Sequence, residues 1–196
     1  MLLSNFLLCL GAYCLGSIPS AIVVCRLMRL PDPRTTGSKN PGSTNVLRMG
    51  NKLAAGLTLL GDVLKGLLPV LLAIHLDFTP FWVGAVMVSV CLGHTYPVFF
   101  GFKGGKGVAT AAGVFLALDV FLGFMLISTW LLVVFLFQFA AMGAVVVALL
   151  APFIVMGYLG PLLVIPVTMI SLLVLWRHRG NMQRLWQGIE PKIGKK

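Results

Sequence analysis

The chain has 196 residues, of which 59% are hydrophobic and only 10% are charged, and it carries a formal net charge of +10. Its mean hydropathy of +1.00 excludes a soluble domain of this size and is typical of a helical membrane protein, which needs about 20 apolar residues per crossing. The sequence therefore predicts an all-α, polytopic membrane fold. Because it shows no internal repeat and no linker, we expect a single domain over residues 1–196.

The first apolar segment covers about residues 2–25. It lacks the basic start of a cleavable signal peptide and is followed by further apolar stretches, so we interpret it as a membrane span. In the second span, Asp62 and Lys65 lie three residues apart and can pair, which would make the burial of two charges tolerable. A role in substrate binding is the alternative for this pair.

The polar connection between these two spans, residues 34–48, is dense in groups that bind anions. Its candidate ligands are Ser38, Asn40, Gly42, Thr44, Asn45 and Arg48. Residues of these types also build ordinary turns, so an isolated segment of this kind is as often a loop as a site. The density of hydroxyl, amide and guanidinium groups favours an anion site, and a helix that starts near Thr44 would add free backbone N–H groups.

The next connection contains glycines around a lysine, namely Gly104, Gly105, Lys106 and Gly107. Glycines let backbone N–H groups point at an anion, and the lysine adds a full positive charge. The segment is not a nucleotide P-loop, because only three residues separate Gly101 from the Gly-Lys pair and no Ser or Thr follows. The pattern predicts a phosphate cradle and not an NTPase.

His94 lies just before this glycine loop and has two open interpretations. It could serve as a general base, or it could orient the loop. Membrane acyltransferases that use thioesters often carry an Asp five positions after such a His, and here that position is Phe99. The four cysteines show no metal-ligand spacing, and we expect neither a metal nor a cofactor.

Four further spans are expected after Gly107, at roughly 108–118, 121–138, 140–156 and 162–176, separated by polar residues or by Gly and Pro. The tail beyond them contains His178 and Asn181, which are three residues apart. If the last span continues as a helix, these side chains share one face and could meet one ligand. Its arginines alone would suggest a membrane anchor.

The charges indicate the orientation of the chain, because basic loops stay on the cytoplasmic side. The first connection, the glycine loop and the tail hold the basic residues, whereas the connections at Asp77 and Asp119 carry acids and no Lys or Arg. We therefore expect the N-terminus outside and the C-terminus in the cytoplasm, with seven transmembrane helices, or five as the alternative. An anionic leaflet or substrate explains the positive charge better than nucleic acid does.

Three separated segments, 37–45 with Arg48, 93–110 and 177–185, together resemble the bacterial acyl-phosphate:glycerol-3-phosphate acyltransferase family, as do 16–20 and 62–66. The resemblance implies a seven-helix inner-membrane enzyme with a cytoplasmic active site. It would transfer a fatty acyl group from acyl phosphate to the 1-hydroxyl of glycerol 3-phosphate, giving lysophosphatidic acid and phosphate. No metal and no acyl-CoA would be required, and we expect a monomer surrounded by membrane lipid.

The same resemblance implies roles for individual residues. Ser38, Thr44 and Asn45 would hold the head group of acyl phosphate. The residues that would hold glycerol 3-phosphate are Arg48, Lys106, His178 and Asn181, with Gly104, Gly105 and Gly107 shaping the loop. The chain departs from the family pattern at Lys39, where glycine is usual, at Ser43, where alanine is usual, and at Ala141, which is commonly serine.

A transporter or channel for phosphorylated anions is the rival interpretation. A transporter usually places polar groups near the membrane midplane and opens to both faces, whereas the charge here lies on one side. A purely structural membrane protein would leave the three glycine-rich polar segments without a purpose.

Overall fold

The computed structural model describes residues 2–193. This part of the chain contains helices and no strand, which confirms the all-α prediction. The α-helices are α1 (Leu2–Gly16), α2 (Ser20–Leu27), α3 (Ser43–Arg48), α4 (Lys52–His75), α5 (Pro80–Thr95), α6 (Val108–Leu118), α7 (Val120–Phe137), α8 (Ala140–Tyr158), α9 (Val164–Arg177) and α10 (Arg179–Trp186), with 3-10 turns η1 (Val98–Phe100) and η2 (Pro161–Leu163).

The expected first span is not one continuous helix, because α1 and α2 meet at an angle of 46°. The last hydrogen bonds of α1 are donated by the backbone N–H groups of Ser17 and Ile18. Pro19 follows and has no N–H to donate, so the ladder stops and α2 restarts at Ser20. The break leaves the carbonyl oxygen of Ile18 to accept from another element, and Lys65 of α4 donates to it.

The helices after the glycine loop lie close to the predicted segments, since α6, α7, α8 and α9 match them to within a few residues. Within the described residues, length and composition qualify four helical segments as candidate spans, and up to six if each bent pair is one span. α6, with 11 residues, is shorter than such a span. Helices therefore form at the four predicted segments, and the number of membrane crossings that they make stays a prediction.

Two helix pairs approach each other closely through glycines. A Cβ atom added to Gly16 of α1 would lie 2.3 Å from the carbonyl oxygen of Val90 in α5, and one added to Gly66 of α4 would lie 2.1 Å from that of Thr110 in α6. No side chain fits in such gaps. Small residues at these contacts let the backbones pack directly, as is common in membrane helix pairs.

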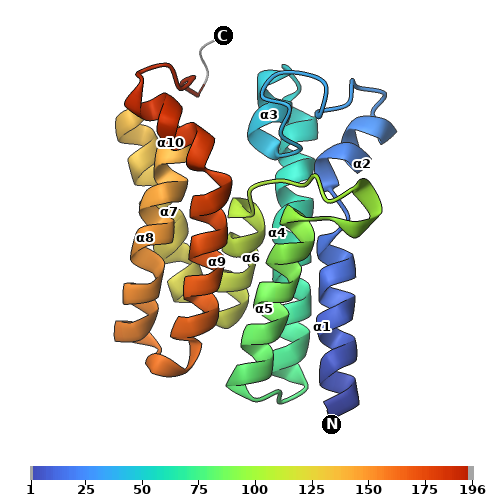
Figure 1. Ribbon diagram of the computed structural model, residues 1–196, viewed down its shortest axis with the longest axis vertical. Helices are drawn as coiled ribbons and strands as arrows, with labels where there is room; N and C mark the ends of the chain where they lie inside the picture. Colours follow the sequence, from blue (N-terminus) through green and yellow to red (C-terminus); the bar gives the residue numbers. More distant parts are fainter. Residues whose placement is uncertain (1, 194–196) are drawn as a thin grey trace.

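The core lies around α5, where Val86, Met87 and Val90 are fully buried. α1 begins at one end of the helix bundle, whereas the α2–α3 connection, the glycine loop and α10 all lie at the other end (Figure 1). The fold therefore brings the three polar segments of the sequence to one face.

Candidate active site

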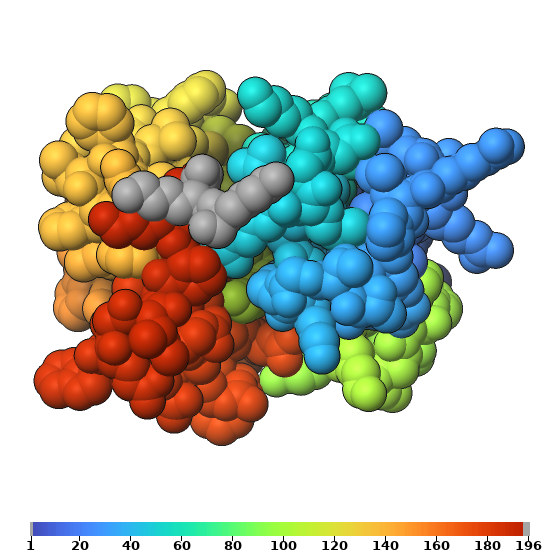
Figure 2. Space-filling model, turned by 90° about the horizontal axis from the view of Figure 1, so that it is seen from above, coloured from blue at the N-terminus to red at the C-terminus, as the bar shows by residue number. Residues whose placement is uncertain are grey.

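This polar face is formed by segments that are far apart in the chain. Figure 2 shows it from above, with the first connection and α3 in blue beside α10 and the tail in red, and with the green segment around residue 100 next to them. The predicted site residues all belong to these segments or to the last turn of α5.

Asn45 of α3 holds the first connection in place. Its side-chain oxygen accepts from the Ser38 backbone N–H at 2.9 Å, and its amide nitrogen donates to the carbonyl oxygens of Pro33 at 2.8 Å and Thr36 at 3.1 Å. Asn45 is 1% exposed. Both of its donor hydrogens are used by the loop, so its side chain acts as an internal clamp.

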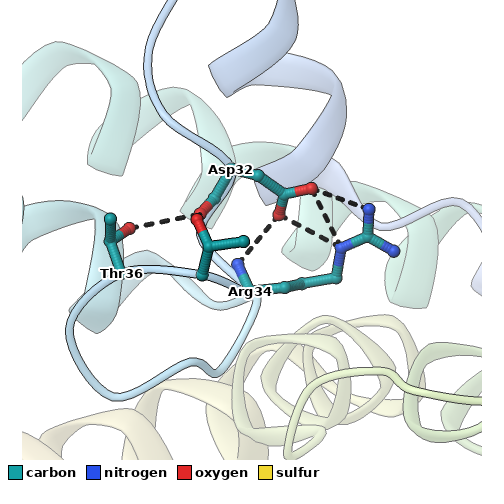
Figure 3. A network of polar contacts seen from close by, with 4 residues as sticks. Asp32, Arg34 and Thr36 are labelled. Atoms are coloured by element: carbon teal, nitrogen blue, oxygen red, sulfur yellow. Dashed lines mark hydrogen bonds and ion pairs between the residues drawn. The ribbon is translucent and has the colours of Figure 1, made fainter.

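Asp32 stabilises the start of the same loop (Figure 3). Its carboxylate forms an ion pair of 2.7 Å with the Arg34 guanidinium, and its carbonyl oxygen accepts from the hydroxyls of Thr35 and Thr36. The hydrogen bonds from Arg34 lower the pKa of Asp32. The loop that carries Ser38 is thus fixed by local contacts as well as by Asn45.

The glycine loop is held from outside by Arg177, at the end of α9. Its guanidinium donates to the carbonyl oxygen of Gly104 at 2.8 Å and to that of Gly105 at 3.1 Å. Gly107 has φ +85°, a left-handed conformation that favours glycine, and it precedes the first turn of α6. With its carbonyl groups bound to Arg177, the loop has a fixed backbone around Lys106.

Lys106 is joined to the tail through a chain of polar contacts. Its Nζ donates to Oδ1 of Asn181 at 2.6 Å, and Nδ2 of Asn181 donates to Oε1 of Glu190 at 2.6 Å. The other oxygen of Glu190 lies 2.7 Å from Nε of Arg184. The structure thus brings together Lys106 and Asn181, as predicted, and adds a carboxylate that the sequence interpretation did not include.

Opposing effects of its surroundings set the pKa of Lys106. Burial lowers its pKa from 10.5 to about 8, and the nearby arginines Arg184, Arg48 and Arg177 act in the same direction. Glu190 opposes this shift. Three arginines and one carboxylate therefore act on this lysine, and the excess positive charge suits a phosphate.

Arg48, at the end of α3, points its guanidinium toward the tail, where Nη2 donates to the Pro191 carbonyl oxygen at 3.2 Å. Its Nε is buried and has no hydrogen-bond partner within residues 2–193. A buried guanidinium N–H without an acceptor is costly, so this group is a natural donor for a ligand oxygen.

The last span does not continue straight, as α9 and α10 meet at 54° with His178 between them. His178 and Asn181 are nevertheless both buried, with 3% and 6% exposure. Nδ1 of His178 lies 2.8 Å from the carbonyl oxygen of Val174. Because a carbonyl only accepts, Nδ1 carries the proton, and Nε2 of the neutral ring is left as an acceptor.

The other predicted residues take less central positions. Ser38 is exposed, and Asn40, Gly42 and Thr44 are partly buried in the same loop. Across residues 2–193, the side chains of Ser38, Asn40 and Thr44 form no hydrogen bond with Lys106 or Asn181. Ala141 is buried in the first turn of α8. His94 is buried beneath the glycine loop.

Sequence interpretation missed the contributions of Arg177 and Glu190. Arg177 was indistinguishable from its neighbouring arginines, because its contact with the glycine loop depends on how α9 packs. Glu190 left a signal, since it is the only acid in the basic tail after Arg177.

Comparison with known proteins decides the family. A family model described as glycerol-3-phosphate acyltransferase matches residues 6–188. The chain belongs to this glycerol-3-phosphate acyltransferase family. The glycerol-3-phosphate acyltransferase of Proteus mirabilis is 56% identical over 182 residues, covering 93% of this chain and 83% of that relative. The one from Erwinia tasmaniensis is 54% identical over 187 residues, covering 95% and 91%.

Solved structures of a glycerol-3-phosphate acyltransferase share this fold. The crystal structure of PlsY, an integral membrane glycerol 3-phosphate acyltransferase, in its glycerol 3-phosphate form has a TM-score of 0.92 and 34% identity, and the match covers 97% of this chain and 96% of that chain. The lysophosphatidic acid form gives a TM-score of 0.91 with the same coverage. These likenesses confirm the family resemblance and a helical integral membrane fold.

Proposed function

We propose that this protein transfers a fatty acyl group from acyl phosphate to the 1-hydroxyl of glycerol 3-phosphate, giving lysophosphatidic acid and phosphate. This is the first acylation step of phospholipid synthesis. The observation that carries the proposal is the basic cluster around Lys106, where a glycine loop, Asn181 and Arg48 converge. Relatives at about 55% identity named glycerol-3-phosphate acyltransferase support it.

The proposed topology has seven crossings, formed by α1 with α2 and then by α4, α5, α6, α7, α8 and α9. The N-terminus lies outside, and the site faces the cytoplasm of a bacterial cell with the protein in its inner membrane. The basic segments at one end of the bundle support this orientation. We further propose that residues 1–196 form one domain that works as a monomer.

The two substrates occupy different parts of the polar face. Lys106, Arg48, His178 and Asn181 hold glycerol 3-phosphate, with the loop of Gly104, Gly105 and Gly107 beneath its phosphate. The loop of Ser38, Asn40, Gly42 and Thr44 holds the phosphate of the acyl donor, and Asn45 keeps that loop in shape. The neutral Nε2 of His178 can accept a hydrogen bond from a glycerol hydroxyl.

The reaction needs little beyond positioning and charge stabilisation, because acyl phosphate is already an activated mixed anhydride. The oxygen of the 1-hydroxyl attacks the acyl carbonyl carbon, the bond from that carbon to the phosphate oxygen breaks, and phosphate leaves. A phosphate oxygen of the substrate takes the hydroxyl proton. Neighbouring cationic side chains stabilise the negative charge that develops on the leaving phosphate.

The test is to incubate the purified, detergent-solubilised protein with labelled glycerol 3-phosphate and either palmitoyl phosphate or palmitoyl-CoA. We expect lysophosphatidic acid with palmitoyl phosphate alone. Product only with the thioester would contradict the proposed donor and retain acyl transfer. No product with either donor, together with uptake of glycerol 3-phosphate into sealed proteoliposomes, would contradict the enzyme and favour a transporter.

A further inference from the structure

The glycine loop rests on the imidazole ring of His94. A Cβ atom added to Gly105 would lie 2.2 Å from Nε2 of His94, and the Gly105 N–H donates to the His94 carbonyl oxygen at 3.1 Å. His94 is 5% exposed. Because Gly105 itself covers Nε2, a substrate hydroxyl would have no room on that side of the ring.

His94 packs in turn against Asp62 of α4, which pairs with Lys65 of the same helix. Oδ1 of Asp62 lies 3.6 Å from Nδ1 of His94 and 2.8 Å from Nζ of Lys65. Nζ of Lys65 also donates to the carbonyl oxygen of Ile18 at 2.8 Å, in the break between α1 and α2. The chain of contacts therefore runs from the α1–α2 break, through α4 and α5, to the glycine loop.

The cluster of Asp62, Lys65 and His94 places charged groups in the interior of the helix bundle. The side chains of Asp62, Lys65 and His94 are 3–5% exposed, within helices that are otherwise largely apolar. A buried ion pair is often no more stabilising than well-packed apolar residues of similar size. The Asp62 carboxylate packs beneath the ring of His94 without a hydrogen bond to Nδ1, so the pair fills the space under the ring, which gives it a purpose beyond stability as a support for the loop.

We propose that Asp62, Lys65 and His94 form a buried seat that positions Gly105, and through it Lys106, for the phosphate of glycerol 3-phosphate. This inference rests on the proposed function and assigns His94 as a positioning residue and not as the base. Lys106 follows Gly105 directly, so a displacement of the loop backbone moves its Nζ away from Asn181. The seat thus acts on substrate affinity through the loop.

The decisive experiment combines substitutions at the two sides of the contact. Gly105→Ala should force the loop away from His94 and raise the KM for glycerol 3-phosphate about tenfold, as expected for coupled neighbours. His94→Ala should also raise the KM, because the loop loses its support. In the double variant the added methyl group enters the space left by the ring, so its KM should be lower than that of Gly105→Ala alone.

Gly104→Ala is the matched control. A Cβ atom there would lie 2.1 Å from the carbonyl oxygen of His94 and 2.6 Å from Cδ of Pro97. The backbone oxygen remains when the His94 side chain is removed, so His94→Ala should not rescue Gly104→Ala. Rescue of both glycine variants, or of neither, would overturn the seat. A kcat in the double variant as low as in His94→Ala, with the KM restored, would instead assign His94 as a base.

A further double variant tests the charges. Asp62→Asn combined with Lys65→Met leaves no unpaired charge in the bundle, and we expect it to raise the KM with a smaller effect on kcat. Unchanged KM and kcat in a folded variant would contradict a role for the pair. If the wild type produced no lysophosphatidic acid, the proposed function would fail. The seat would then be tested by the same rescue pattern in unfolding temperature.

Discussion

Lys106 and Asn181 are 75 residues apart in the chain, yet Nζ of the lysine donates to the amide oxygen of the asparagine at 2.6 Å. The glycine loop, predicted to cradle a phosphate, and the tail, predicted to meet a ligand, therefore lie in direct contact. The remaining hydrogens of the ammonium group are available to a phosphate. The Glu190 carboxylate orients the Asn181 amide so that its oxygen, and not its nitrogen, faces the lysine.

Lys106→Ala should remove most activity without unfolding the protein. The loss of a charge-assisted contact in a partly buried site should lower kcat/KM for glycerol 3-phosphate about 100-fold. Lys103→Ala, on an exposed side chain in the same loop, is the control and should retain activity. Activity like that of the wild type in Lys106→Ala, measured as labelled lysophosphatidic acid, would contradict the assignment of the site.

The lowered pKa of Lys106 predicts a dependence on pH. Below about pH 8 the group is an ammonium that attracts phosphate, and above that value it increasingly loses its proton and its charge. We therefore expect kcat/KM for glycerol 3-phosphate to fall as the pH rises through about 8. A profile measured from neutral to alkaline pH, corrected for spontaneous hydrolysis of the donor, checks this expectation. In Lys106→Arg, whose guanidinium stays charged, the decline should move to higher pH.

A substitution of Glu190 should shift the same pH profile of kcat/KM. Its carboxylate raises the pKa of Lys106, so Glu190→Gln should lower that pKa and shift the decline in kcat/KM to lower pH. The glutamine can still accept a hydrogen bond from Asn181, which makes the substitution a test of charge more than of shape. A profile that keeps its midpoint in a folded Glu190→Gln variant would show that this carboxylate does not tune the lysine.

Lys39 offers a prediction about stability. Its φ of +56° lies in the left-handed region, which costs a residue with a side chain about 1–2 kcal/mol. Glycine avoids that cost, although its more flexible unfolded state returns about 0.5–1 kcal/mol. Lys39→Gly should therefore raise the unfolding temperature in detergent slightly. Lys39→Ala keeps the Cβ atom and should not. Equal unfolding temperatures for the two variants would contradict this explanation.

Local patterns were enough to predict several features of the molecule. The all-α fold, the helices after Gly107 and the Asp62–Lys65 pair are confirmed, because apolar length and the spacing of residues along a helix determine them. The hydrogen bonds of Asn45 to its own loop and the hydrogen bond from Asn181 to Glu190 could not be predicted in this way. They depend on how a loop and a tail fold back, which no periodicity records.

Arg48 supports the last prediction. Its Nη2 donates to the Pro191 carbonyl oxygen, whereas its buried Nε has no acceptor within the described residues. If that N–H serves a substrate phosphate, Arg48→Ala should lower kcat/KM for glycerol 3-phosphate by a factor similar to that of Lys106→Ala. Arg48→Lys should not restore it fully, because an ammonium cannot reproduce the directed donors of a guanidinium.

The control for this variant is Arg29→Ala, which removes an exposed arginine before the same loop and should leave kcat/KM unchanged. An equal loss in both variants would indicate a general effect of positive charge at the membrane surface. Loss in Arg48→Ala alone, with an unchanged unfolding temperature, would assign the effect to the site. Direct binding of glycerol 3-phosphate by calorimetry then separates the two proposed phosphate positions, since only a residue that holds this substrate should weaken its binding in the absence of acyl phosphate.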